Sequence, residues 1–274
     1  GNLKVTASDD VTLQNTGNDV AKLAANITSA GKSFKYTDAN TLAIDQVAQA
    51  GSSAVALGVP SGTGATQALM NGITTLGGSG GSVVVNTLST GTLDVNQAIS
   101  TVPTGTGTTV GGAVVLESNG AITTAAAGTI TTTGQASAAG LGGVGGEVFI
   151  HHTNLTTTAG DITLGGTVTA NGGSAAVGGT TGGSGGVVTL LNERGGIVVN
   201  AALSANGGAA GSGVQGNGGT VQLVSTGTAV ASTITQGGSG QITATGATGG
   251  NLKVTASDDV TLQNTGNDVA KLAA

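Results

Sequence analysis

Carboxylates are the side chains of this sequence best suited to chemistry, because clustered acids can bind calcium and paired acids can hydrolyse a glycosidic bond. Asp9 and Asp10 are adjacent at an expected turn. The remaining aspartates considered are scattered along the chain: Asp19, Asp38, Asp45, Asp94 and Asp161. We expect no catalytic site, no cofactor and no resident metal, because turn capping explains the acids more simply. Weak calcium binding at Asp9 and Asp10 is the alternative.

The two histidines, His151 and His152, are adjacent. Neighbouring side chains of a strand face opposite sides, so the two rings could not bind one metal ion together. We expect one ring to point outward and the other to end a strand. Cysteine is absent, which excludes a disulfide framework and a thiolate metal site.

Two glycine patterns resemble nucleotide-binding motifs. Residues 26–33 read NITSAGKS, which has asparagine where a P-loop requires its first glycine, and Ser33 leads into an alternating strand pattern instead of a helix. The pattern G-x-G-x-x-G occurs at 140–145 and 211–216, but chance matches are expected among 53 glycines. Because no βαβ pattern surrounds them, we interpret these segments as flexible loops.

The end of the chain, residues 250–274, repeats its beginning, residues 1–25, without a difference. The offset from Gly1 to Gly250 is 249 residues, so the chain reads as part of a tandem array. We predict that residues 1–249 form one full repeat unit and that residues 250–274 form the first coil of the next identical unit. We expect this coil to stack on the one that begins at Gly219, with the Asn251 strand in the place that the Asn2 strand has in the first unit.

A shorter repeat lies inside the long one: glycine followed by alternating apolar residues, at spacings of roughly 30 to 40 residues. Each coil contains about three short strands separated by turn residues, as in residues 113–118, 121–123 and 129–131. The pattern predicts an all-β, right-handed parallel β-helix (β-solenoid) with about seven coils per 249 residues, one of them supplied by Phe34-Lys35-Tyr36. The residues expected to fill its core are Val83, Val85, Val114, Leu116, Val148, Ile150, Val188, Leu190, Val221 and Leu223. The strands expected at the repeat junction carry Leu3, Val5, Leu252 and Val254.

Composition fits this fold better than an ordinary globule. Hydrophobic residues make up 38% of the chain but aromatic residues only 1%, which suits a narrow bore filled with stacked aliphatic side chains. The net charge of −6 and the single arginine disfavour a nucleic-acid partner. No apolar run approaches the length of a membrane span. Residues 19–25 and 45–50 have some helix propensity, and we expect at most a short helical turn there.

Threonines at 123, 131, 133, 163 and 169 are expected to form outward rows. Ice-binding β-helices use such rows on one flat, regular face. The coils of this chain vary in length, and threonine is favoured in strands in its own right, so we interpret these rows as structural.

The coil from Gly112 to Thr131 resembles those of filamentous-haemagglutinin-like exoproteins, and so do the segments 18–25, 34–38 and 42–44. The resemblance implies export by a Gram-negative bacterium, a location outside the cell or at its surface, and a role as an adhesin, matrix fibre or stalk. Any targeting and anchoring segments are then expected outside this sequence.

We therefore expect a structural, non-enzymatic filament or stalk segment whose partner is itself, head to tail between repeats and also laterally between fibres. Two alternatives stay open. A carbohydrate-binding adhesin would recognise glycans of a host or neighbouring cell through a groove with aromatics, of which the chain has only Phe34, Tyr36 and Phe149. A β-helix polysaccharide lyase or hydrolase would need a cluster of acids on one face.

Overall fold

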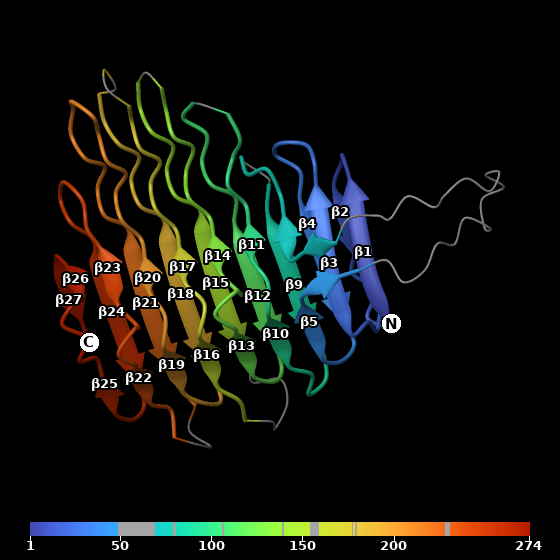
Figure 1. Ribbon diagram of the computed structural model, residues 1–274. Helices are drawn as coiled ribbons and strands as arrows, with labels where there is room; N and C mark the ends of the chain where they lie inside the picture. The colour runs from blue at the N-terminus through green and yellow to red at the C-terminus, as the bar shows by residue number, and fades with distance from the viewer. Residues whose placement is uncertain are drawn as a thin grey trace, which may run out of the picture.

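The structure is a computed structural model that describes residues 1–48, 69–78, 81–105, 107–138, 140–153, 159–176, 178, 180–227 and 231–274. It confirms the all-β prediction: these residues contain strands, turns and no helix, so no helix long and apolar enough to cross a membrane is found among them. Figure 1 shows the strands side by side from the N-terminal to the C-terminal end.

Two parallel sheets carry the fold. The first has nine strands: β2 (Val11–Leu13), β4 (Phe34–Asp38), β9 (Val83–Thr87), β12 (Val114–Ser118), β15 (Glu147–His152), β18 (Val187–Asn192), β21 (Thr220–Ser225), β24 (Asn251–Ala256) and β27 (Lys271–Ala273). Seven of these strands, β2 to β21, lie within residues 1–249, which agrees with the seven predicted coils.

The second sheet has sixteen strands in two arms that meet at β3 (Lys22–Ile27), with β1 (Asn2–Ala7) paired to β3. The first arm contains β5 (Leu42–Ile44), β10 (Leu93–Val95), β13 (Ile122–Thr124), β16 (Ile162–Leu164), β19 (Ile197–Val199), β22 (Ile234–Gln236) and β25 (Val260–Thr261). The second arm contains β8 (Ile73–Thr74), β11 (Ile99–Ser100), β14 (Ile130–Thr131), β17 (Val168–Thr169), β20 (Leu203–Ser204), β23 (Ile242–Ala244) and β26 (Asp268–Val269). A short antiparallel pair, β6 (Gln46–Val47) and β7 (Met70–Asn71), forms a separate two-stranded sheet.

Each coil visits the nine-stranded sheet, then the first arm, then the second. In the coil that begins at β12, β13 and β14 follow where the sequence predicts them, and each strand pairs in register with its equivalents one coil away. Four of the five predicted threonines form rows, with Thr123 beside Thr163 on the first arm and Thr131 beside Thr169 on the second, whereas Thr133 lies outside the strands. Because they lie on different arms, they do not make one flat face.

The core is a continuous column of aliphatic side chains between the sheets. All ten residues predicted to fill it have 0% exposure, and Leu252 and Val254 at the C-terminal end have 4%. The aromatic rings of Phe34 and Tyr36 lie in the same column, at 0% and 1% exposure. Burial raises the pKa of the Tyr36 hydroxyl, which donates a hydrogen bond of 2.8 Å to Asp38.

A column of buried polar residues runs along the end of the nine-stranded sheet, where each coil turns toward the first arm. We call it the corner column, and its members have 0% exposure and pair in register: Asp38, Thr87, Ser118, His152, Asn192 and Ser225. Several donate hydrogen bonds to main-chain carbonyls of the turn: the hydroxyl of Ser118 donates to Gly91 and that of Ser225 to Gly195. The corner column therefore satisfies backbone groups that the turn would leave buried without partners.

We expected the glycine-rich segments to be flexible loops, but they form a regular, hydrogen-bonded structure. Residues 133–146, 171–186 and 206–219, apart from 139, 177 and 179, form a row of arches beyond the second arm, seen above the strands in Figure 1. We call them the glycine wing. Main-chain hydrogen bonds cross the wing in series, from Gly143 to Gln135, Gly173 to Gly143, Gly183 to Gly173 and Gly208 to Gly183.

Close approach of the main chain explains why these positions are glycine. A Cβ atom on Gly143, Gly173 or Gly183 would lie closer to a neighbouring carbonyl oxygen than the 3.0 Å that real Cβ atoms keep. The wing is thus a regular, hydrogen-bonded layer that only glycine permits. The two G-x-G-x-x-G matches lie inside it.

The duplicated segment, residues 1–25 and 250–274, keeps its local pairing but occupies different sheets. Asn2 pairs with Lys22 and Asn251 with Lys271, so equivalent positions pair in both copies. However, β1 and β3 belong to the sixteen-stranded sheet, whereas β24 and β27 belong to the nine-stranded sheet. The expectation that the Asn251 strand takes the place of the Asn2 strand is therefore wrong. The later copy is aligned by β21, with which β24 pairs, whereas β1 pairs with β3.

The helix propensity of residues 19–25 does not produce even a short helical turn, because Lys22 to Ala25 belong to β3. Of residues 45–50, Gln46 and Val47 form β6, while 49 and 50 lie outside the described residues. Both segments form strands because strand pairing outweighs a weak helix propensity.

Candidate functional site

The outer face of the nine-stranded sheet contains a cleft with a volume of about 370 Å³. It crosses four coils, from β9 to the end of β18. All of its lining residues except Leu88 have polar side chains: Asn86, Leu88, Glu117, Asn119, His151, Thr153 and Glu193. A concave site with a few convergent polar groups is the usual form of a ligand site, so this cleft is the candidate functional site.

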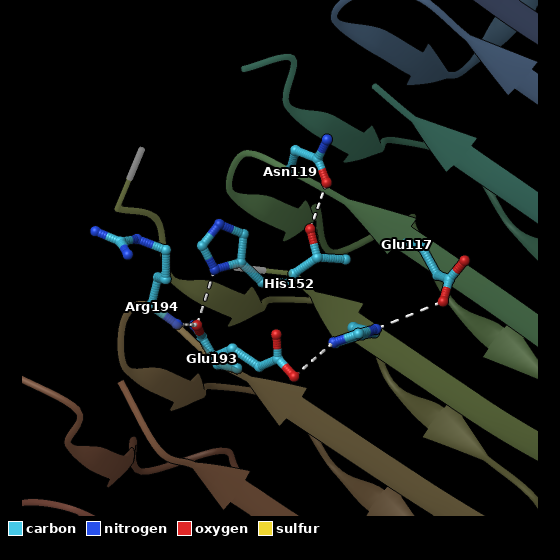
Figure 2. Close-up of polar contacts among 8 residues, drawn as sticks. Glu117, Asn119, His152, Glu193 and Arg194 are labelled. Carbon is cyan, nitrogen blue, oxygen red and sulfur yellow. Dashed lines mark hydrogen bonds and ion pairs between the residues drawn. The ribbon is translucent and has the colours of Figure 1, made fainter. Parts of the chain in front are cut away.

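Strand register brings the titratable groups of the cleft together. Glu117 on β12 pairs directly with His151 on β15, and Glu193 follows the last residue of β18. The Nδ1 atom of His151 lies 3.5 Å from Oε1 of Glu117, and its Nε2 atom lies 3.6 Å from Oε1 of Glu193. In Figure 2 a dashed line from each of the labelled side chains Glu117 and Glu193 marks these contacts. When protonated, this ring can form an ion pair on each side.

The ring of His151 is also held from its own strand. Phe149 lies two residues earlier on the same outer face, and the two ring centroids are 5.4 Å apart at an angle of 44°. Phe149 is the aromatic residue of the chain that faces outward, since Phe34 and Tyr36 are buried in the core. A partly exposed ring beside carboxylates and amides offers both an apolar contact and hydrogen bonds.

Metal chelation does not fit this arrangement. Glu117 and Glu193 contact opposite nitrogens of one ring, so the three side chains do not converge on a common point. Across the part of the chain that the structure describes, no group of three His, Cys, Asp or Glu residues is placed to hold a metal ion. The cleft instead offers carboxylate, amide and hydroxyl groups, which hydrogen-bond neutral polar ligands well.

His152 lies behind the cleft, in the corner column. As the sequence predicts, the two adjacent rings face opposite sides, and His152 is the last residue of β15. Its Nδ1 atom lies 2.8 Å from Oδ1 of Asn192, whose amide donates hydrogen bonds to the carbonyls of Gly160 and Gly196. Since the amide nitrogen is the donor to both carbonyls, Oδ1 must accept, and Nδ1 of His152 carries the proton.

Asp9 and Asp10, the predicted calcium ligands, lie at the N-terminal end, far along the chain from the cleft. Asp9 forms an ion pair of 2.7 Å with Lys32, and Asp10 accepts hydrogen bonds from the backbone and hydroxyl of Ser33. These hydrogen bonds hold the pKa of each carboxyl below its usual range, and the bond to Asp9 raises the pKa of Lys32. Lys32 and Ser33, the P-loop-like residues, thus serve this contact and lead into β4.

The other aspartates that we considered for catalysis make separate contacts. Asp45 forms an ion pair of 2.7 Å with Lys22, and Asp94 accepts a hydrogen bond from Thr123. Asp161 accepts from the backbone of Gly196. Asp38 belongs to the corner column, and Asp19 accepts from the side chain of Asn40. The structure gathers none of these groups into the cleft.

Sequence reasoning missed Glu117 and Glu193, because they lie far apart in the sequence. Their positions relative to the strand-opening glycines could have revealed them. Glu117 and His151 each follow a strand-opening glycine by five residues, while Asn119, Thr153 and Glu193 each follow one by seven. Residues with equal offsets stack in a solenoid, so aligning the coils on glycine would have predicted this group.

A second hollow, of about 550 Å³, lies between β1, β3 and the segment around β7, lined by Lys4, Thr6, Ala25, Asn26, Leu69, Met70, Asn71 and Thr74. It carries one charged side chain and no pair of titratable groups. The cleft that Glu117, His151 and Glu193 line is therefore the better candidate.

No family model, no curated protein and no solved structure matches this chain.

Proposed function

We propose that this chain is a segment of a structural filament or stalk, built from repeats that join end to end. The observation that supports this most is the pairing at the repeat junction. All six residues of β24 pair in register with all six of β21, from Thr220 beside Asn251 to Ser225 beside Ala256. The start of a second repeat thus continues the ladder of the first.

The mechanical role follows from the way the coils are joined. Three rows of strands, the aliphatic core and the corner column all run in the direction in which coils are added. Each coil contacts its neighbours above and below, so stability grows with the number of coils and the array resists bending. Exposed strands at either end are templates for further pairing, which a following repeat would cover.

The resemblance to filamentous-haemagglutinin-like exoproteins supports an extracellular position for this filament, on the cell surface or secreted. In that setting it would act as a non-enzymatic adhesin stalk or matrix fibre whose partner is the next repeat.

Chains that contain one, two and three tandem 249-residue units test the proposal. If repeats stack, electron microscopy will show single rods that lengthen by about 34 Å per unit, because seven coils advance about 4.8 Å each. A Val254→Asp change at one junction places a charge in the core and should create a bend or break at that position. Particles whose length does not scale with unit number would refute the filament.

The cleft supports a second candidate function, recognition of a glycan by the stalk. Its carboxylates, amides and hydroxyl suit a ligand rich in hydroxyl groups. Phe149 does not line the cleft, but it contacts the ring of His151 and is the aromatic side chain nearest to such a ligand on this face. Glu117→Gln and Glu193→Gln chains should lose binding on a glycan array, while Asp94→Asn, which changes an acid on the first arm, should retain it. Equal binding by the natural chain and these three variants, or binding by none of them, would exclude this site.

A further inference from the structure

The glycine wing presents a regular outward pattern of side chains. Its outer segments read x-G-G-x-G-G, as in Leu141 to Gly146 and Thr181 to Gly186. The glycines between the x positions are mostly buried, whereas Leu141 is 53% exposed and Val144 43% exposed. Extended chains with three residues per turn place every third side chain on the same side. The x positions therefore share the outer surface of the wing.

These x positions also align from coil to coil. Leu141, Thr181 and Val214 are joined by parallel bridges and form one row. A second row contains Val110, Val144, Ser184 and Asn217, linked by hydrogen bonds from Gly111, Gly145 and Gly185 to the carbonyl of the next coil. The surface thus repeats at the spacing of the solenoid itself.

The exposed large apolar side chains of the described residues lie in three places. Leu13, Val260 and Leu272 belong to the terminal coils, and Leu69 borders residues outside the described part. The other exposed large apolar side chains lie in the wing or beside it: Val110, Leu141, Val144, Val187 and Val214. A neighbouring repeat would cover the terminal coils, but it would leave the wing open.

The wing carries no charge. The chain has 7 basic and 13 acidic residues and a net charge of −6, yet residues 133–146, 171–186 and 206–219 of the wing contain none of them, and neither do the flanking segments 101–112 and 244–250. Two copies of an acidic filament repel each other wherever their carboxylates meet. The wing is the side on which a second copy can approach without that repulsion.

We propose that the glycine wing is a lateral docking surface for the wing of a second copy of this chain. The two surfaces have the same one-coil spacing, so the rows of x positions can interdigitate along their whole length. This inference goes beyond the proposed function, because it concerns the side of the solenoid. Only the growth of the contact with repeat number depends on the filament.

Disulfide cross-linking tests the contact directly, because the natural chain has no cysteine. A Leu141→Cys chain should form covalent dimers under mild oxidation at least about tenfold faster than a Ser239→Cys chain, which marks an exposed turn between β22 and β23. Adding Val214→Glu to Leu141→Cys should slow dimer formation to the control rate. Val214 is 59% exposed, so this change should leave the circular dichroism spectrum and melting temperature unaltered.

Dimer formation that is no faster at Leu141 than at Ser239 would overturn the proposal, and so would a Leu141→Cys rate that Val214→Glu leaves unchanged. Cross-linking through the wing reports on lateral contact alone, whereas rod length reports on end-to-end stacking. The two proposals can therefore fail separately.

Discussion

Nδ1 of His152 lies 2.8 Å from Oδ1 of Asn192, in a part of the solenoid with no exposure to solvent. Asn192 makes four hydrogen bonds there: it accepts from His152 and from the backbone of Arg194, and it donates to Gly160 and Gly196. One side chain thus joins strand β18 to its neighbouring coil and to the following turn.

Removal of this side chain should be costly. In an Asn192→Ala chain the carbonyl of Gly160 and the ring of His152 lose the hydrogen bond from this side chain, while the carbonyl of Gly196 keeps the one from the backbone of Ile162. Each buried polar group left without a partner costs about 1 to 3 kcal/mol, so we expect a loss of at least about 2 kcal/mol in the free energy of unfolding. Chemical denaturation measures this. Thr189→Ala, on the outward face of the same strand, is the control and should cost less than about 1 kcal/mol.

The glycine wing predicts a strong dependence on single glycines. A Gly183→Ala change puts a methyl group against the carbonyl of Gly143, and the main chain must shift to accommodate it. We expect a loss of about 1 to 3 kcal/mol and faster hydrogen exchange across residues 171–186. Gly238→Ala is a matched control, because nothing lies within 4 Å of the added atom. Equal exchange in both variants would contradict the close packing of the wing.

The first coils should loosen in acid. Hydrogen bonds from Lys22, Lys32 and Ser33 lower the pKa values of Asp45, Asp9 and Asp10 respectively in the folded chain. A lowered folded-state pKa stabilises the fold above the unfolded value, near 3.9 for aspartate, and this contribution disappears as the pH falls through the folded value. Hydrogen exchange in residues 1–48 should therefore increase below about pH 4.

An Asp45→Asn chain is the control for this pH dependence. It should exchange faster at neutral pH at the contact with Lys22 and show a smaller further increase in acid. Unchanged exchange in residues 1–48 of the natural chain between neutral pH and pH 3 would contradict the role of these ion pairs.

The sequence predicts those parts of the fold that depend on local alternation. Ile122 and Ile130 fall on strands where apolar residues alternate between turns, and the adjacent histidines face opposite sides as expected. The wing was missed because a three-residue glycine pattern has no counterpart in a period of two. Glu117 and Glu193 were missed because they meet only through the register of three coils, which no local pattern contains.

The duplicated segment shows the same limit. Leu3 and Val5 have the alternation of a core strand, but alternation alone does not specify which sheet receives them. Their equivalents Leu252 and Val254 stack on Val221 and Leu223 because the coil that begins at Gly219 aligns them. Identical residues therefore lie in different sheets according to the strands with which they pair.

Pairing at the junction leads to a final prediction. Gln222 and Lys253 are register partners on β21 and β24, so their side chains point to the same face one coil apart. Partners in adjacent strands lie about 4.8 Å apart, a Cα separation that a disulfide can span. A chain with Gln222→Cys and Lys253→Cys should therefore form an internal disulfide under mild oxidation.

The chain with Gln222→Cys and Lys4→Cys is the control. It should not form a disulfide, although Lys4 occupies the same place in the duplicated sequence, because β1 belongs to the other sheet. Mass spectrometry after proteolysis identifies the linked peptides, and a link to residue 4 instead of 253 would show that the two copies had exchanged places.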